Sequence, residues 1–170
     1  MKAKLSAQFN WVTALMLLTL SSCALLSGDA APPSAKGDIY QLHFQRSGWS
    51  VRQDKRADYV WSHHDGRVLL ANSFCDQFQS GSLEDYAIKT ARSVEQLEIL
   101  DKKITHFRSR EAFMLKARGK VDGVEVNLTL LNSRRNNCYF DFVSIIPGTT
   151  PAQPSFEKDF DYFLESVEFR

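Results

Sequence analysis

The chain has 170 residues, with 21 Lys and Arg against 20 Asp and Glu, so its formal net charge at pH 7 is +1. This near-neutral balance lacks the strongly basic character expected of a nucleic-acid-binding protein. The 44% hydrophobic content and the 12 phenylalanines are enough to fill the core of one compact domain.

The N-terminal segment has the pattern of an export signal. Lys2 and Lys4 precede an apolar run, Val12–Leu20, which is shorter than the roughly 20 residues that a membrane-spanning helix needs. The run ends in Leu20-Ser21-Ser22-Cys23, which resembles the lipobox of bacterial lipoproteins. The resemblance implies that residues 1–22 are a lipoprotein signal peptide and that Cys23 carries the lipid, with palmitate-type acyl chains. An ordinary secretory signal with an incidental cysteine is the alternative.

Residues 23–37 are expected to form the lipidated cysteine and a flexible tether. Small residues and the Pro32-Pro33 pair dominate this stretch, and such a composition cannot bury a core. Ala24 stands where an Asp would retain an enterobacterial lipoprotein at the inner membrane. The resemblance therefore implies anchoring in the outer membrane, facing the periplasm, with residues 38–170 as a single domain.

Two cysteines remain once Cys23 is assigned to the lipid. Cys75 and Cys138 form an even pair, which in an oxidising compartment predicts a structural disulfide. A pair of buried free thiols and a redox-active pair are the alternatives. The second of these lacks the Cys-x-x-Cys spacing that redox proteins usually have.

Alternating patterns and turn signals predict strands in the first half of the domain. Asp65-Gly66 is a strong hairpin signal between two strand-like runs. The expected strands are Ile39–Phe44, Trp49–Val51, Tyr59–His64 and Arg67–Cys75. Ser82, with Asp85 at the capping-box distance, is expected to start a helix whose apolar face runs from Leu83 to Leu97.

The second half is predicted to hold more strands and a closing helix. Asp122-Gly123 predicts another hairpin, Ser133–Asn137 a polar turn, and Cys138–Ile146 a central strand covered on both faces. The other expected strands are Lys103–Phe107, Ala112–Arg118 and Val124–Leu131. Ser155 is expected to cap a helix with a buried stripe of Phe156, Phe160, Phe163, Leu164 and Val167. The predicted fold class is α+β, an antiparallel sheet of about six to seven strands with two packed helices.

This order of elements resembles the PsbP-like fold. The residues that carry the resemblance are the helix start Ser82–Tyr86, the Asp122-Gly123 hairpin and the closing segment Phe156–Phe169. The fold occurs in the extrinsic photosystem II subunit, in a nuclear-import accessory protein that binds a small GTPase, and in bacterial envelope lipoproteins. The resemblance implies a binding or accessory role, although a fold alone does not establish a function.

Few residues form a pattern with chemical meaning. His63-His64 suggests a metal site, but adjacent strand residues point to opposite faces, so two solvated histidines are the simpler interpretation. Asp141 lies among aromatic residues, where burial would raise its pKa, as happens at catalytic sites. The alternative places Asp141 near a sheet edge, partnered by Arg134 or Arg135 or by a backbone amide. The segment Arg134–Asn137 is either an ordinary polar turn or a contact for lipid head groups or an acidic partner.

We therefore expect a lipid-anchored envelope protein of a non-catalytic binding or accessory type. Its partners would be the membrane, through the lipid, and an envelope protein or small ligand, with no nucleic acid. A small periplasmic hydrolase that uses Asp141 or the His63/His64 region is the alternative. No catalytic residue, cofactor or metal ligand is assigned, because the sequence has no phosphate-binding loop, zincin helix or paired-cysteine zinc motif.

Overall fold

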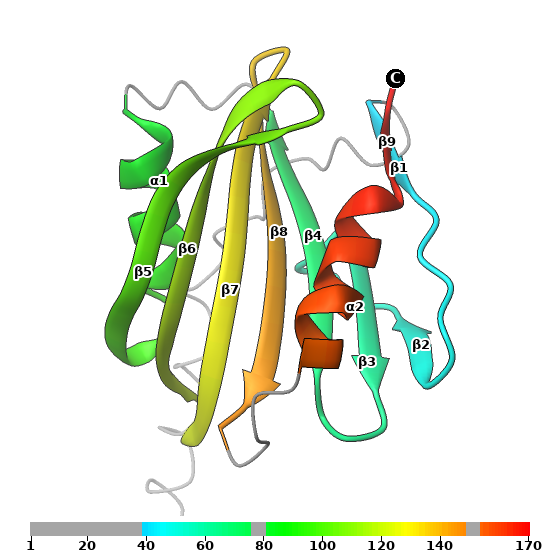
Figure 1. Cartoon of the computed structure of the whole chain (residues 1–170), viewed down its shortest axis with the longest axis vertical. Helices are drawn as coiled ribbons and strands as arrows, with labels where there is room; N and C mark the ends of the chain where they lie inside the picture. Colours follow the sequence, from blue (N-terminus) through cyan, green and yellow to red (C-terminus); the bar gives the residue numbers. More distant parts are fainter. Residues whose placement is uncertain (1–38, 76–80, 149–153) are drawn as a thin grey trace, which may run out of the picture. The chain divides into compact units, whose positions relative to one another are not determined.

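A seven-stranded antiparallel sheet forms the body of the protein (Figure 1). The computed structural model describes residues 39–75, 81–148 and 154–170, all within one compact unit, Pro32–Arg170. The predicted signal peptide, Cys23 and the tether lie outside the described residues. Across the sheet the order is β2-β3-β4-β8-β7-β6-β5, with bounds β2 Trp49–Arg52, β3 Tyr59–His63, β4 Val68–Cys75, β8 Cys138–Pro147, β7 Val124–Arg135, β6 Arg110–Val121 and β5 Glu95–Phe107.

Two helices and a small second sheet complete the fold. Helix α1 spans Leu83–Ala91 and α2 spans Pro154–Glu165, while β1 (Tyr40–Leu42) pairs with β9 (Val167–Phe169). The predicted α+β class, with two helices packed on an antiparallel sheet, is confirmed.

The central strand β8 separates two hydrophobic cores. Phe140 and Phe142 point to the face that carries α2 and the β1–β9 pair, and Val143 points to the face that carries α1. The first seven residues of β8, Cys138–Ser144, are all buried. The prediction of a central strand covered on both faces is therefore confirmed.

The hairpins form where their turn residues predict them. Asp122 and Gly123 have φ angles of 51° and 78°, the left-handed conformation that a two-residue turn between antiparallel strands requires. Asn136 and Asn137, at 47° and 62°, make the same kind of turn between β7 and β8. The polar turn predicted over Ser133–Asn137 is thus shorter than expected, because β7 continues to Arg135.

The first helix is shorter than its apolar spacing predicts, and the next strand is longer. Ser82 and Asp85 form the expected capping box, but α1 ends at Ala91, and Leu97 belongs to β5. Gly119 of β6 permits this path, since a Cβ there would lie 2.6 Å from both the Glu95 carbonyl oxygen and Val94 Cγ1. The segment that follows α1 therefore packs directly against the backbone of β6 at Gly119. Most β5 side chains are exposed, which is why little of this 13-residue strand was predicted.

The closing segment also differs from the prediction at both ends. Helix α2 begins at Pro154, so Ser155 lies inside its first turn and is not its cap. The helix ends at Glu165, and Val167 is buried as part of β9, not as the last member of a helical stripe. The remaining members of the predicted stripe are buried: Phe156, Phe160, Phe163 and Leu164.

Truncation of Phe160 tests how α2 packs. Phe160 is 4% exposed and belongs to the core on the α2 face, so Phe160→Ala removes a large buried ring and is expected to cost about 3–5 kcal/mol of unfolding free energy. Lys158→Ala, on the exposed side of the same helix, is the control and should cost no more than about 0.5 kcal/mol. Urea unfolding of both variants measures the difference, and equal costs would mean that α2 does not pack in this way.

Candidate functional site

Asp141 lies in the middle of the sheet, on the face that carries α1. Its cross-strand neighbours are Asn132 on β7 and Asn72 on β4, and its exposed fraction is 2%. The interpretation of Asp141 as a sheet-edge carboxylate paired with Arg134 or Arg135 is therefore wrong. A charged group this deep in a sheet must find hydrogen-bond donors, because burial without them is costly.

Three side chains donate to the Asp141 carboxylate. Asn132 Nδ2 donates to Oδ1, while the Tyr86 hydroxyl and Thr90 Oγ1, both from α1, lie 3.4 and 3.5 Å from Oδ2. Tyr86 and Thr90 are four residues apart and so share one side of the helix. Burial raises the pKa of Asp141 to about 7, against the lowering effect of these donors. The expectation of a raised pKa is thus supported.

The surroundings of Asp141 fit a structural role better than a catalytic one. The carboxylate is enclosed between the sheet and α1, and its three donors are neutral groups, of which Asn132 and Tyr86 are buried and Thr90 is partly buried. Asn132 Oδ1 is also buried and has no hydrogen-bond partner among the described residues. The cluster fastens α1 to the sheet and can accept a proton near neutral pH.

His63 lies on the other face of the sheet, so it cannot share a site with Asp141. Trp61, two residues before it on β3, belongs to the core on the α2 face. Contrary to prediction, the His63 side chain is only 11% exposed, and its Nδ1 lies 2.7 Å from Asp65 Oδ1. His64 is exposed as expected, but its ring centroid lies 4.0 Å from that of His63, so the two rings do not point to opposite faces. Among the described residues, no group of three or more His, Cys, Asp and Glu side chains could hold a metal ion.

A buried arginine joins the β3–β4 hairpin to α2. Arg67 is 6% exposed; its Nη1 lies 2.7 Å from Asp159 Oδ2, and its Nε lies 2.8 Å from Asp65 Oδ2. The guanidinium carbon lies 4.0 Å from the centroid of the Phe156 ring, and Arg46 completes the neutralisation of Asp159 at 2.8 Å. This clasp between Arg67 and Asp159 spans 92 residues of sequence, which is why no local pattern predicted it.

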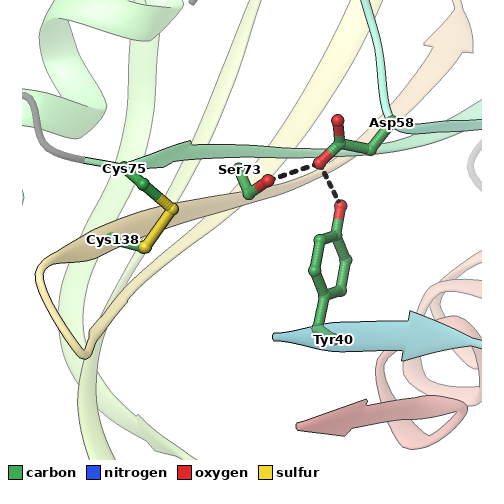
Figure 2. Close-up of a disulfide and its surroundings, with 5 residues drawn as sticks. All are labelled: Tyr40, Asp58, Ser73, Cys75 and Cys138. Carbon is green, nitrogen blue, oxygen red and sulfur yellow. Dashed lines mark hydrogen bonds between the residues drawn. A yellow bond between two sulfur atoms is a disulfide. The ribbon is translucent and has the colours of Figure 1, made fainter. Parts of the chain in front are cut away.

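The structure contains the Cys75–Cys138 disulfide, between directly opposed residues of β4 and β8 (Figure 2). Their Cα atoms lie 4.1 Å apart. Close to it, the Asp58 carboxylate accepts hydrogen bonds of 2.6 Å from both the Tyr40 hydroxyl and Ser73 Oγ (Figure 2). Burial, and then Asp58, raise the pKa of Tyr40, which therefore stays a hydrogen-bond donor. Tyr40 thus ties β1, the first strand, to the main sheet.

Besides a cavity of about 380 Å³ lined by Gln96, Glu98, Arg118 and Asn127 among others, two cavities in the described part of the chain could accept small polar molecules. One, of about 360 Å³, lies at the start of α1 and is lined by Ser82, Arg110, Glu111, Arg134 and Tyr139 among others. The other, of about 250 Å³, lies between α2 and the sheet over an apolar floor that includes Met114, Ile146 and Phe160. Both are at or below the lower end of the size range of typical ligand pockets. Neither is lined by Asp141 or His63.

Comparison with known proteins identifies the fold and not a function. No protein-family model and no curated protein sequence matches this chain. Among solved structures, cyanobacterial PsbP (CyanoP) from Synechocystis sp. PCC 6803 superposes with a TM-score of 0.57 at 16% identity, covering 89% of this chain and 99% of CyanoP. LpqN, a Mycobacterium tuberculosis protein involved in cell envelope biogenesis, has a TM-score of 0.51 at 9% identity, covering 76% of this chain and 82% of LpqN.

A third similar structure is PA94 from Pseudomonas aeruginosa, described as a putative regulator of unknown function. Its TM-score is 0.51 at 13% identity, with 78% of this chain and 96% of PA94 covered. In the part of the chain that the structure describes, neither helix is long and apolar enough to cross a membrane. The domain of this chain therefore has the PsbP-like fold that its order of elements predicts.

The raised pKa of Asp141 predicts a pH dependence of stability. The folded protein holds this proton up to about pH 7, whereas an unfolded Asp loses it near pH 4. The folded state therefore binds more protons between these values, so the free energy of unfolding falls as pH rises through this window, by roughly 4 kcal/mol from this group. Asp141→Asn removes the titration but keeps the shape. Urea unfolding from pH 4 to 8 should show wild-type stability falling relative to the variant, and a constant difference would contradict the assignment.

The disulfide should contribute substantially to stability. In the chain-entropy model a loop of this length gives about 4 kcal/mol, so Cys75→Ala with Cys138→Ala should lower the free energy of unfolding by a similar amount. A reductant should destabilise the wild type and leave the double variant unchanged. Non-reducing peptide mapping that finds both thiols free in protein from the native envelope would contradict the assignment.

Proposed function

We propose that this protein is a lipid-anchored component of a bacterial envelope, held at the outer membrane on the periplasmic side, with a binding or accessory role. The lipobox-like Leu20-Ser21-Ser22-Cys23 supports the anchor. The Cys75–Cys138 disulfide is typical of proteins in an oxidising compartment, such as the periplasm.

The proposal that the role is non-catalytic rests on the positions of the candidate acid–base groups. Asp141 is enclosed beneath α1, and His63 is held by Asp65 and Arg67 on the opposite face of the sheet. An acid–base mechanism needs such groups within reach of one substrate atom, about 3 Å, or one water molecule away. The two candidate groups cannot meet at one substrate, so the geometry does not favour a hydrolase.

The similar structures add support of a general kind. LpqN shares the fold and is described as involved in cell envelope biogenesis, and CyanoP is the cyanobacterial form of PsbP. At 16% identity or less these relationships concern the fold, so the role itself is an inference by analogy.

The lipid anchor has a direct test. Cys23→Ala removes the only sulfur that the lipobox places for acylation, so the variant is expected to lose all incorporation of an alkyne fatty acid fed to the cells. Ser22→Ala is the matched control, because it keeps a small residue before the cysteine and should be labelled like the wild type. In-gel fluorescence of the purified protein measures the label. Labelling of Cys23→Ala at the wild-type level would overturn the proposal.

The accessory role has a separate test in the native host. Asp141→Asn should restore any phenotype of a deletion strain as fully as the wild-type gene does, because Asp141 acts only within the fold. A variant that is folded, lipidated and present at normal levels, yet inactive in the strain, would indicate catalysis by Asp141 and count against the proposal.

A further inference from the structure

Arginines gather at the end of the domain where the chain enters it from the tether. Turn residue Arg108 joins β5 to β6, Arg110 begins β6, and Arg134 and Arg135 end β7. These turns lie at the same end of the domain as the C-terminus, at the top of Figure 1. Arg170 follows β9 there, and its backbone N–H donates to the Ile39 carbonyl at 2.9 Å. Ile39 is the first described residue, so the covalent path from Cys23 arrives at this end.

Contacts between side chains confirm that these segments share one end. The guanidinium carbon of Arg135 lies 5.0 Å from the centroid of the Phe169 ring. Phe169 in turn contacts Phe107 at the end of β5, with ring centroids 6.1 Å apart. We call the set Arg108, Arg110, Arg134 and Arg135 the arginine end.

The charges of the arginine end are largely uncompensated. Within the described ranges, Arg108, Arg110, Arg134 and Arg135 form no ion pair with a carboxylate; Arg108 donates instead to the Glu165 carbonyl. Elsewhere, Arg118 pairs with Glu98, Lys116 with Glu157 and Lys102 with Glu84, whereas single cations such as Lys120 and Lys158 form no ion pair among the described residues. The arginine end differs because several unpaired arginines lie together there. Carboxylates also lie at this end: Glu111 lines a cavity with Arg110 and Arg134, Glu165 is next to Arg108, and Glu168 is on β9. The four arginines outnumber these three carboxylates, so the balance remains positive.

We propose that the arginine end lies against the anionic head groups of the membrane in which the protein is anchored. This inference rests on the proposed lipid anchor, which would keep the domain near that surface. Fifteen residues, 24–38, separate Cys23 from Ile39. A flexible linker of that length has ends about 20 Å apart on average, so the tether alone leaves the orientation of the domain open.

Electrostatics then select the orientation. Attraction to an anionic surface acts within a Debye length, about 8 Å at physiological ionic strength, so only the end that reaches the surface contributes. Once residues 1–22, with Lys2 and Lys4, are removed, 19 Lys and Arg remain against 20 Asp and Glu, so an excess of arginine at one end leaves the remainder of the surface more acidic. The surface field therefore attracts the arginine end and repels the opposite end. Guanidinium groups also bind phosphates with two parallel hydrogen bonds.

The test measures binding to vesicles without the lipid. The chain from residue 23 onward carrying Cys23→Ser contains every described residue and no acyl group. It is expected to co-sediment with vesicles that contain phosphatidylglycerol, and not with vesicles of phosphatidylcholine alone. Binding should weaken steeply as salt is added, because the contacts are electrostatic.

A matched pair of double variants tests the location. Arg110→Gln with Arg134→Gln should lower the partition constant about 25-fold, since each basic residue at such a surface contributes about fivefold. Lys120→Gln with Lys158→Gln removes the same charge away from the arginine end and should leave binding within about twofold. Thermal melts of both proteins check that they are folded.

Two outcomes would overturn the inference: no binding to anionic vesicles at low salt, or equal losses in the two double variants. The absence of binding to anionic vesicles would instead favour an acidic protein as the partner of these arginines. The vesicle assay uses protein without lipid, so a negative result there says nothing against lipidation of Cys23. Lipidation is tested separately, by incorporation of the alkyne fatty acid.

Discussion

The burial of β8 on both faces is the constraint on which the rest of the structure depends. A strand enclosed between two cores leaves no water for its polar side chains, so each must be satisfied by a neighbour. Cys138 is satisfied by the disulfide to Cys75, and Asp141 by Asn132 and two hydroxyls of α1. The same burial that raises the pKa of Asp141 also closes it to substrates. A perturbed carboxylate is often a sign of catalysis, but here its surroundings point to a structural role.

The two faces of the sheet are fastened in different ways. On the α1 face, the neutral side chains of Tyr86, Thr90 and Asn132 donate hydrogen bonds to Asp141. On the α2 face the contacts are ionic: Arg67 lies between Asp65 and Asp159 and stacks on the Phe156 ring. A buried ion pair adds little net stability compared with apolar packing, but losing one partner is costly. This clasp fixes the position of α2 relative to the β3–β4 hairpin. A hydrogen bond from the neutral Tyr40 hydroxyl to Asp58 fixes the first strand, which is the strand nearest to the predicted tether in the sequence.

Local sequence signals predicted most of the fold. The Asp65-Gly66 and Asp122-Gly123 turns, the Ser82–Asp85 capping box and the disulfide were all visible in the sequence. Strand β5 was largely missed, because its exposed residues carry no alternating pattern and its start depends on the absence of a side chain at Gly119. The Arg67–Asp159 clasp was not predicted, and the segment Arg134–Asn137 was the only part of the arginine end that the sequence suggested as a contact for lipid head groups. Both features depend on residues that only the topology brings together. A near-zero net charge says nothing about where on a surface the charges lie. Cys23 remains a prediction from the lipobox alone.

The orientation of the anchored domain tests the account most directly, because it depends on both the lipid and the arginine end. Lipidated, isotopically labelled protein in nanodiscs that contain phosphatidylglycerol and a gadolinium-chelating lipid would report which amides approach the membrane. The account predicts strong paramagnetic broadening of the amide signals of Ser109 and Asn136, and little broadening at Asp122 and Gly123 in the β6–β7 turn. Equal broadening at the two ends of the sheet, or stronger broadening at Asp122 and Gly123, would contradict it.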